Sequence, residues 1–212
     1  MILNSEIILV HGLWFGPWAM ARLARQLQAS GFPVRRFGYS STLEELHSHA
    51  GELREFARQS DVEHQHFVGH SLGGLVILKM LAETGDLPRG RVILLGSPLD
   101  GSVVARKSLK VPQAGKLLGE VRSALDQGFS QLPPDRDTGM IAGSRSIGLG
   151  WMVGGTGSPG DGTVAINETR IEGLKDHLVL PVTHTGMLYS KKVAGQTAHF
   201  ARNGWFLKEK PA

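Results

Sequence analysis

The chain has 212 residues, 28 of them glycine, and no cysteine. A chain of this length can bury the core of one ordinary domain, so we expect a single domain over residues 1–212. The lack of cysteine excludes disulfides, thiolate metal sites and a cysteine nucleophile. The formal net charge of +4 comes from scattered and paired basic residues without a long basic run, so we expect no nucleic-acid partner.

The first ten residues are typical of a strand rather than of a signal peptide. They have no basic start and no long apolar stretch, and Glu6 interrupts them. No segment of the chain approaches the ~20 apolar residues of a membrane span. We therefore expect a cytoplasmic protein without an integral membrane segment, whereas the oligomeric state is not indicated.

Strand and helix patterns then alternate along the chain. This alternation predicts an α/β fold of three layers, in which helices flank a mostly parallel β-sheet on both faces. The predicted strands are residues 6–10, 34–39, a run that ends at Val68, 91–96, 138–143 and 177–182. The predicted helices run from Pro17 to a stop at Gly31, from a capping box of Thr42 and Glu45 to about Gln59, from Leu72 onward, over roughly 112–125, and over roughly 186–202.

Two segments break this rhythm. Residues 97–137 contain one obvious amphipathic helix between loops, and we interpret them as a small lid insertion. Residues 144–162 form a glycine-rich loop that contains Trp151 and Met152. Long loops in a compact domain usually carry function or mobility, so both segments are expected near the functional site.

A serine lies between the third predicted strand and the helix that follows it. The sequence there is Gly69-His70-Ser71-Leu72-Gly73, a Gly-x-Ser-x-Gly pattern. Glycines at the flanking positions let the chain turn sharply, so that a strained serine projects its hydroxyl into a cleft. Because a serine hydroxyl is a weak nucleophile at neutral pH, it needs a nearby base and a group that orients this base.

His184 is the favoured base because it follows the last predicted strand, at the carboxyl end of the sheet. His177 begins the same strand, and seven residues of strand place it ~20 Å from His184. His70 points away from its neighbour Ser71 and is expected to pack, as is His11. The remaining histidines are expected at the surface or hydrogen-bonded, and no carboxylate at ligand spacing supports a metal site. These are His47, His49, His64 and His66, whereas His199 is expected on the face of the final predicted helix.

Asp161 is the favoured orienting acid. Gly160 and Gly162 flank it in a loop, and the chain order of serine, acid and histidine matches Ser71, Asp161 and His184. Asp100 follows the strand over residues 91–96 and remains the main alternative.

Two backbone N–H groups are expected to stabilise the oxyanion of an acyl-transfer reaction. Leu72 directly follows the serine, and Leu13 follows His11 and Gly12 after the first predicted strand. We predict that these two residues form the oxyanion hole.

Taken together, these motifs resemble the α/β-hydrolases, and within them the bacterial lipase and esterase-like group. The resemblance rests on His11-Gly12-Leu13-Trp14, Gly69 to Gly74, Asp161-Gly162-Thr163-Val164 and His184. It implies a Ser71/Asp161/His184 triad, oxyanion donors at Leu13 and Leu72, and no cofactor. Many relatives insert a larger helical lid where this chain has about forty residues, which implies a rather open site and disfavours a strict long-chain lipase.

We therefore expect a serine hydrolase that cleaves small-molecule carboxylic esters through an acyl-enzyme on Ser71. An acyltransferase or thioesterase with the same triad is the alternative, and a non-catalytic ligand-binding scaffold is a second. Apolar residues near the predicted site could line an acyl or alcohol pocket or simply belong to the core. They are Trp14, Phe15, Trp151, Met152, Met187 and Leu188.

Overall fold

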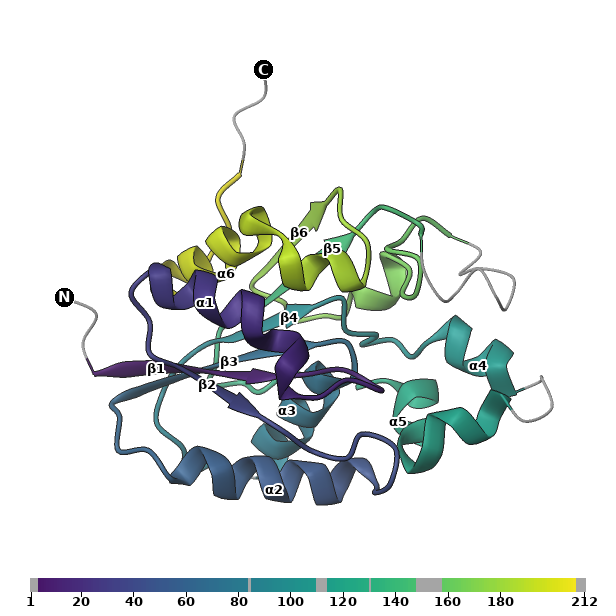
Figure 1. Ribbon diagram of the computed structural model, residues 1–212, viewed down its shortest axis with the longest axis horizontal. Coiled ribbons are helices and arrows are strands. Elements are labelled where there is room, and N and C mark those ends of the chain that lie inside the picture. The colour runs from purple at the N-terminus through teal and green to yellow at the C-terminus, as the bar shows by residue number, and fades with distance from the viewer. Residues whose placement is uncertain (1–3, 84, 110–113, 130, 148–157, 209–212) are drawn as a thin grey trace.

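The computed structural model describes residues 4–83, 85–109, 114–129, 131–147 and 158–208 (Figure 1). Six strands in this part of the chain form one sheet in the order β2-β1-β3-β4-β5-β6, and each neighbouring pair is parallel. The predicted parallel sheet is thereby confirmed. The strands are β1 (Ser5–Val10), β2 (Val34–Phe37), β3 (His64–His70), β4 (Val92–Leu95), β5 (Thr138–Gly143) and β6 (Asp176–Leu180).

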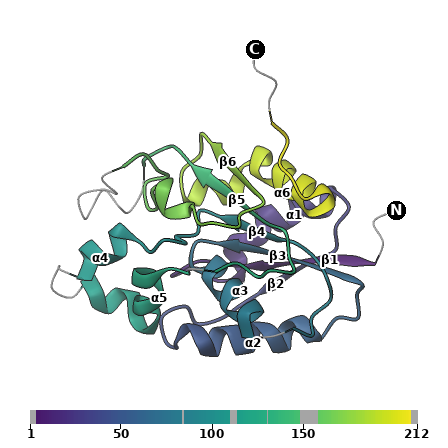
Figure 2. The ribbon, with the colours of Figure 1, turned by 180° about the vertical axis from the view of Figure 1, so that it is seen from behind.

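Helices cover both faces of the sheet, as predicted. In Figures 1 and 2, α1 (Ala21–Ala29) and α6 (Lys191–Asn203) lie on one face, and α2 (Leu46–Arg58) and α3 (Leu72–Glu83) lie on the other. Near one end of the sheet lie α4 (Val103–Leu109), η2 (Ala114–Val121) and α5 (Arg122–Gln127). The short helical turns are η1 (Pro17–Met20), η4 (Asn167–Thr169) and η5 (Thr185–Tyr189).

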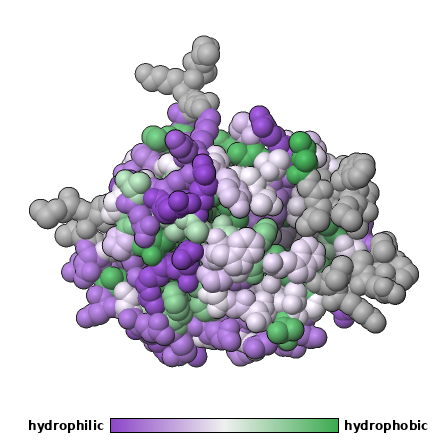
Figure 3. Space-filling view, in the orientation of Figure 1, coloured by the Kyte–Doolittle hydropathy of each residue, from purple (hydrophilic) through white to green (hydrophobic). Residues whose placement is uncertain are grey.

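The core has two halves, one on each side of the sheet. Ile8 and Val10 of β1 pack with α2 and α3, whereas Ile7 and Leu9 pack with α1 and α6. Successive side chains of a strand point to opposite faces, so a continuous apolar run suits a strand buried on both sides. On the face seen in Figure 3, hydrophobic residues occur in small separate groups among hydrophilic ones. In the described part of the chain, no helix is long and apolar enough to cross a membrane.

The predicted capping box before α2 is wrong. α2 begins at Leu46, its N-cap is Glu45, and no side chain caps it. The backbone oxygen of Thr42 instead accepts a hydrogen bond of 3.3 Å from the N–H of Glu120, which lies in η2. This contact holds the backbone before α2 in a conformation without the predicted capping box.

Among its described residues, the β4–β5 segment, residues 97–137, contains the three helical pieces α4, η2 and α5 rather than the single helix predicted over 112–125. Gly119 interrupts that helix with φ +61° and ψ −151°, and a Cβ at this position would collide with the backbone oxygen of Thr42. The same close approach therefore explains both errors. The predicted helix over 186–202 is also divided, because Ser190 caps α6 by accepting a hydrogen bond from Val193 N–H.

Candidate active site

Ser71 lies at a sharp turn between β3 and α3. Its φ of +54° is a conformation that L-amino acids rarely adopt. A Cβ at Gly69 would lie 2.5 Å from Gly74 N, and a Cβ at Gly73 would overlap the backbone oxygen of Val10. Both flanking glycines are thus required by close backbone packing, as the sequence pattern predicts. The strain at Ser71 is held in place by this packing.

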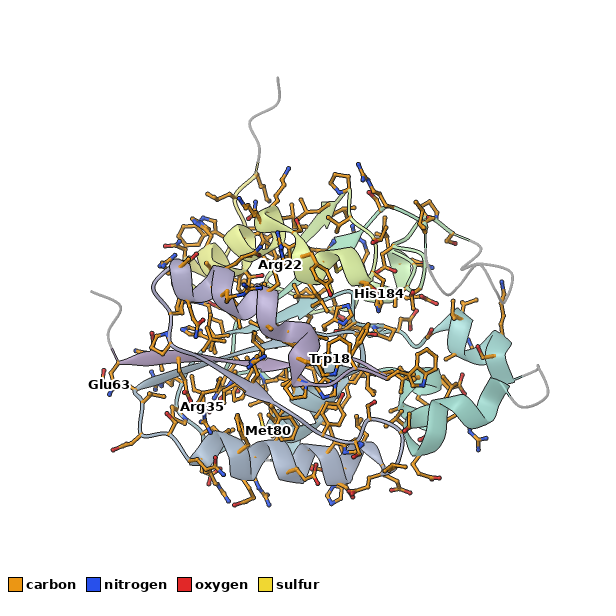
Figure 4. The ribbon with its side chains drawn as sticks, in the orientation of Figure 1. Trp18, Arg22, Arg35, Glu63, Met80 and His184 are labelled. Atoms are coloured by element: carbon orange, nitrogen blue, oxygen red, sulfur yellow. The ribbon has the colours of Figure 1, made fainter. Side chains whose placement is uncertain are left out.

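His184 and Asp161 form a buried pair at the end of the sheet that faces α4 and α5. Figure 4 shows His184 at this end, whereas Glu63, which precedes β3, lies at the opposite end. The Nδ1 of His184 lies 2.7 Å from Oδ2 of Asp161, and the N–H of His184 donates to the backbone oxygen of Asp161 at 2.9 Å. An Nδ1–H that donates to the carboxylate leaves Nε2 of His184 unprotonated and able to accept a proton.

The carboxylate of Asp161 is 1% exposed and is held by backbone donors. Its Oδ1 accepts hydrogen bonds from Thr163 N–H at 2.9 Å and from Val164 N–H at 2.8 Å. Burial alone would raise the pKa of Asp161, but the charge and hydrogen bond of His184 and these backbone N–H groups outweigh it and lower the pKa. Asp161 is therefore ionised at neutral pH and has a fixed orientation.

The structure brings Asp161, and not the alternative Asp100, to His184. Asp100 is exposed, and its backbone N–H donates to the oxygen of Glu168 at 3.0 Å.

The side chain of His70 contacts His184 of the same pair. It is fully buried, and its Nε2 lies 3.0 Å from the backbone oxygen of His184, to which an Nε2–H can donate. Burial, and next the neighbouring charge of His184, lower the pKa of His70 to about 3. His70 is accordingly neutral at physiological pH and packs as predicted, with a hydrogen bond that the sequence did not reveal.

His11 and His49 both contact the ring of Tyr39. The Tyr39 hydroxyl donates to the backbone oxygen of His11 at 2.9 Å, which steadies the turn that follows β1. His49 is fully buried rather than at the surface, and its Nδ1 lies 3.8 Å from the carboxylate Oε2 of Glu52. Helix α2 carries it inward against Tyr39.

The turn after β1 packs directly against Ser71. A Cβ at Gly12 would lie 3.0 Å from the Cβ of Ser71, and Leu13 lines the same cavity as the serine. Leu72 is the first residue of α3. These positions suit the two predicted oxyanion donors, whose N–H groups remain a prediction.

A cavity of about 290 Å³ opens onto Ser71 and His184. The β4–β5 segment supplies one wall, and the turns after β1, β5 and β6 supply the other. No Asp, Glu, Lys or Arg is among the described residues that line it, so the cavity is mostly apolar. Its lining residues are Gly12, Leu13, Trp14, Phe15, His70, Ser71, Pro98, Ser102, Val104, Ala105, Ser108, Leu118, Leu125, Ile147, Thr163, Val164, His184 and Thr185.

The predicted pocket residues have different outcomes. Trp14 and Phe15 line the cavity. Met187 does not, because it is fully buried in the core half of α1 and α6, and Leu188 lies in the same core. The Met187 side chain extends to the end of β5, where its Cε would lie 2.9 Å from a Cβ at Gly143. Trp151 and Met152 lie outside the described residues.

The sequence did not reveal the cavity wall formed by α4. This helix has only seven residues, too few for a clear helical period. One usable signal was Ser102, whose hydroxyl oxygen accepts a hydrogen bond of 3.2 Å from Ala105 N–H, as an N-cap serine does.

A larger cavity of about 1090 Å³ lies elsewhere and contains none of these residues. Charged side chains line it, and several neutralise one another: Asp137 lies 3.3 Å from Arg91 and 3.7 Å from Lys175. Within the described residues, no group of three or more His, Asp or Glu side chains could hold a metal ion.

Comparison with known proteins identifies the family. The model of the alpha/beta hydrolase family matches residues 7–184. The chain belongs to this family. No curated protein sequence matches this α/β-hydrolase.

Solved structures share its fold at low sequence identity. The mature lipase BlEst2 of Bacillus licheniformis is 18% identical with a TM-score of 0.74, and the alignment covers 96% of this chain and 93% of that one. A metagenomic carboxyl esterase is 16% identical with a TM-score of 0.68, over 87% of this chain and 65% of that one. A pyrethroid hydrolase from Sphingobium faniae is 14% identical with a TM-score of 0.67, over 94% and 98%.

Proposed function

We propose that this α/β-hydrolase is a serine hydrolase that cleaves carboxylic esters through an acyl-enzyme on Ser71. The observation that carries the proposal is the 2.7 Å contact between His184 Nδ1 and a buried Asp161, at a cavity that Ser71 also lines. A base held in one tautomer beside a strained serine is the arrangement that serine hydrolases use.

In this proposal, Ser71 Oγ attacks the ester carbonyl carbon and passes its proton to Nε2 of His184. The N–H groups of Leu13 and Leu72 stabilise the negative oxygen of the tetrahedral intermediate. The intermediate then expels the alcohol, which takes the proton from His184. His184 then takes a proton from a water molecule that attacks the acyl-enzyme and gives it to Ser71 Oγ as the acid is released, while Asp161 stabilises the imidazolium that forms in each step.

The cavity favours an uncharged acyl group of modest size. Its volume of about 290 Å³ is at the lower end of ligand pockets, and its described lining offers no ion-pair partner for a charged acyl chain. The lipase, the carboxyl esterase and the pyrethroid hydrolase named above all act, by those names, as hydrolases, which supports the same class of reaction here.

The test is covalent labelling and turnover of three proteins: the wild type, Ser71→Ala, and Ser123→Ala, a control at an exposed serine of α5. We expect a fluorophosphonate probe to label the wild type and Ser123→Ala but not Ser71→Ala. We also expect a burst of p-nitrophenol from p-nitrophenyl butyrate that Ser71→Ala lacks.

Labelling that survives in Ser71→Ala would overturn the nucleophile. A wild type that neither reacts with the probe nor hydrolyses esters would support a ligand-binding scaffold instead. Free acid as the main product in the presence of an added alcohol supports a hydrolase, whereas transfer of most of the acyl group to this alcohol would indicate an acyltransferase.

A further inference from the structure

Glu168 is a buried carboxylate outside the reacting groups. It lies in η4 and is 3% exposed. Its two oxygens accept hydrogen bonds from different segments: Oε1 from Val103 N–H at 2.5 Å and Oε2 from Ala165 N–H at 2.7 Å. Its backbone oxygen accepts a third hydrogen bond from Asp100 N–H at 3.0 Å.

The first of these segments is the wall of the cavity. Val103 is the first residue of α4, and the next residues of this helix, Val104 and Ala105, line the cavity beside Ser71. Any movement of Val103 therefore moves the surface on which an acyl group would lie.

The second segment is the turn that holds the acid. Residues 160–165 close on themselves, because Gly160 and Ala165 form a β-bridge and Asp161 N–H donates to the oxygen of Val164 at 3.1 Å. The same turn provides the backbone donors for the carboxylate of Asp161. Ala165 is thus the end of the turn that Glu168 fixes.

Burial of this carboxylate raises the free energy of the folded state. Burial raises the pKa of Glu168, although the N–H groups of Val103 and Ala165 and the charge of Arg106 partly oppose the rise. An apolar side chain would fill a buried site without this cost, so a carboxyl group held by backbone N–H groups of two site segments indicates a role beyond packing.

We propose that Glu168 is a positioning residue that joins the cavity wall to the acid turn, so that the shape of the acyl pocket and the orientation of Asp161 are set together. It touches no reacting atom and acts through α4 and through residues 160–165. Its kinetic consequence rests on the proposed esterase function, whereas its structural consequence does not.

Glu168→Gln tests whether Glu168 links α4 to residues 160–165. The amide keeps one oxygen acceptor but turns an NH2 group toward the other N–H, so one of the two hydrogen bonds is replaced by opposed donors. Ser102→Ala is the matched control, because it removes a hydrogen bond only within the start of α4. Glu168→Asp, which keeps the charge but shortens the reach, serves as a second variant where the amide variant does not fold.

Hydrogen–deuterium exchange measured by mass spectrometry shows directly whether the stability of both segments depends on Glu168. In Glu168→Gln, we expect exchange to be faster by about tenfold or more in both α4 and residues 160–165, with α3 unchanged, since a lost buried hydrogen bond has an effect of this size. In Ser102→Ala, we expect the increase in α4 alone. An increase in only one segment of Glu168→Gln, or an equal increase throughout the chain, would overturn the proposal.

Ester kinetics then separate the two proposals. With p-nitrophenyl acetate and hexanoate, we expect Glu168→Gln to lower kcat about tenfold for both esters and to raise KM more for hexanoate, while the exposed-site control Glu172→Gln leaves both constants unchanged. A wild type without esterase activity would refute the proposed function, and the exchange result would still decide the role of Glu168. An active wild type whose Glu168→Gln variant keeps the same kcat and the same ratio of KM values would overturn the kinetic role.

Discussion

Replacing Asp161 by Asn removes the charge of the acid while leaving its shape. The amide oxygen can still accept the hydrogen bonds from Thr163 and Val164, but an NH2 group then faces Nδ1 of His184, 2.7 Å away. His184 must therefore shift its proton to Nε2 to accept from the amide, and in this tautomer it cannot take a proton from Ser71.

The structure sets the size of this effect. Asp161 is 1% exposed, and in Asp161→Asn the imidazolium that forms in the transition state loses its buried charge partner, an effect of about 3–5 kcal/mol. At about 1.4 kcal/mol for each factor of ten, kcat is expected to fall by about 10² to 10⁴. The upper value matches the drop of about 10⁴ expected when an orienting acid becomes an amide.

The assay is steady-state hydrolysis of p-nitrophenyl butyrate at pH 7.5, with circular dichroism as a check that the variant folds. Asp100→Asn is the matched control, because Asp100 is an exposed acid that precedes His184 in the chain. A kcat of Asp161→Asn within tenfold of the wild type would refute the role of Asp161 as the orienting acid. So would a larger loss in Asp100→Asn.

Four further substitutions have defined outcomes. Gly96→Ala places a Cβ 2.9 Å from Oδ2 of Asp161 at φ +59°, so kcat should fall by at least about tenfold in a protein that still folds, and an unchanged kcat would contradict the geometry. Gly73→Ala, whose Cβ overlaps a backbone oxygen of β1, should lose about 3 kcal/mol or more of unfolding free energy in urea, whereas Gly51→Ala, with open space in α2, should gain about 0.5–1 kcal/mol. Burial, with neighbouring cations, lowers the pKa of His66 to about 4, so the unfolded chain binds more protons between pH 4 and 6.5, and stability is lost as the pH is lowered from 6.5 to 4. His66→Gln should flatten this dependence by on the order of 3 kcal/mol, and an unchanged slope would refute the assignment.

The sheet and its flanking layers were predictable because they rest on patterns within short stretches. The run at Ile7 to Val10 and the helix that begins at Leu72 each bury their apolar residues where the periodicity places them. The division of the helix predicted over 112–125 was not predictable in this way, because Gly119 and Thr42 determine it through a contact between distant parts of the chain. Local propensity contains no information about such contacts.

The candidate site divides along the same line. Ser71 and His184 follow strand ends, and parallel strands bring their carboxyl ends to one edge, so the sequence can place both residues there. Met187 was predicted at the pocket because it is near His184 in the chain, yet its helical turn carries it into the core. The link from Glu168 to α4 had no local signal, since Val103 is 65 residues away and only the folded chain brings the two together, whereas Ala165 is a neighbour in the sequence.

Locating the acyl group tests most directly whether Ser71 is the nucleophile. The wild type is mixed with a slowly hydrolysed p-nitrophenyl ester, quenched in acid during the burst, digested and sequenced by tandem mass spectrometry. The prediction is one acyl group per chain, on Ser71, and none in Ser71→Ala. An acyl group on another residue, or burst hydrolysis without a covalent adduct, would contradict it.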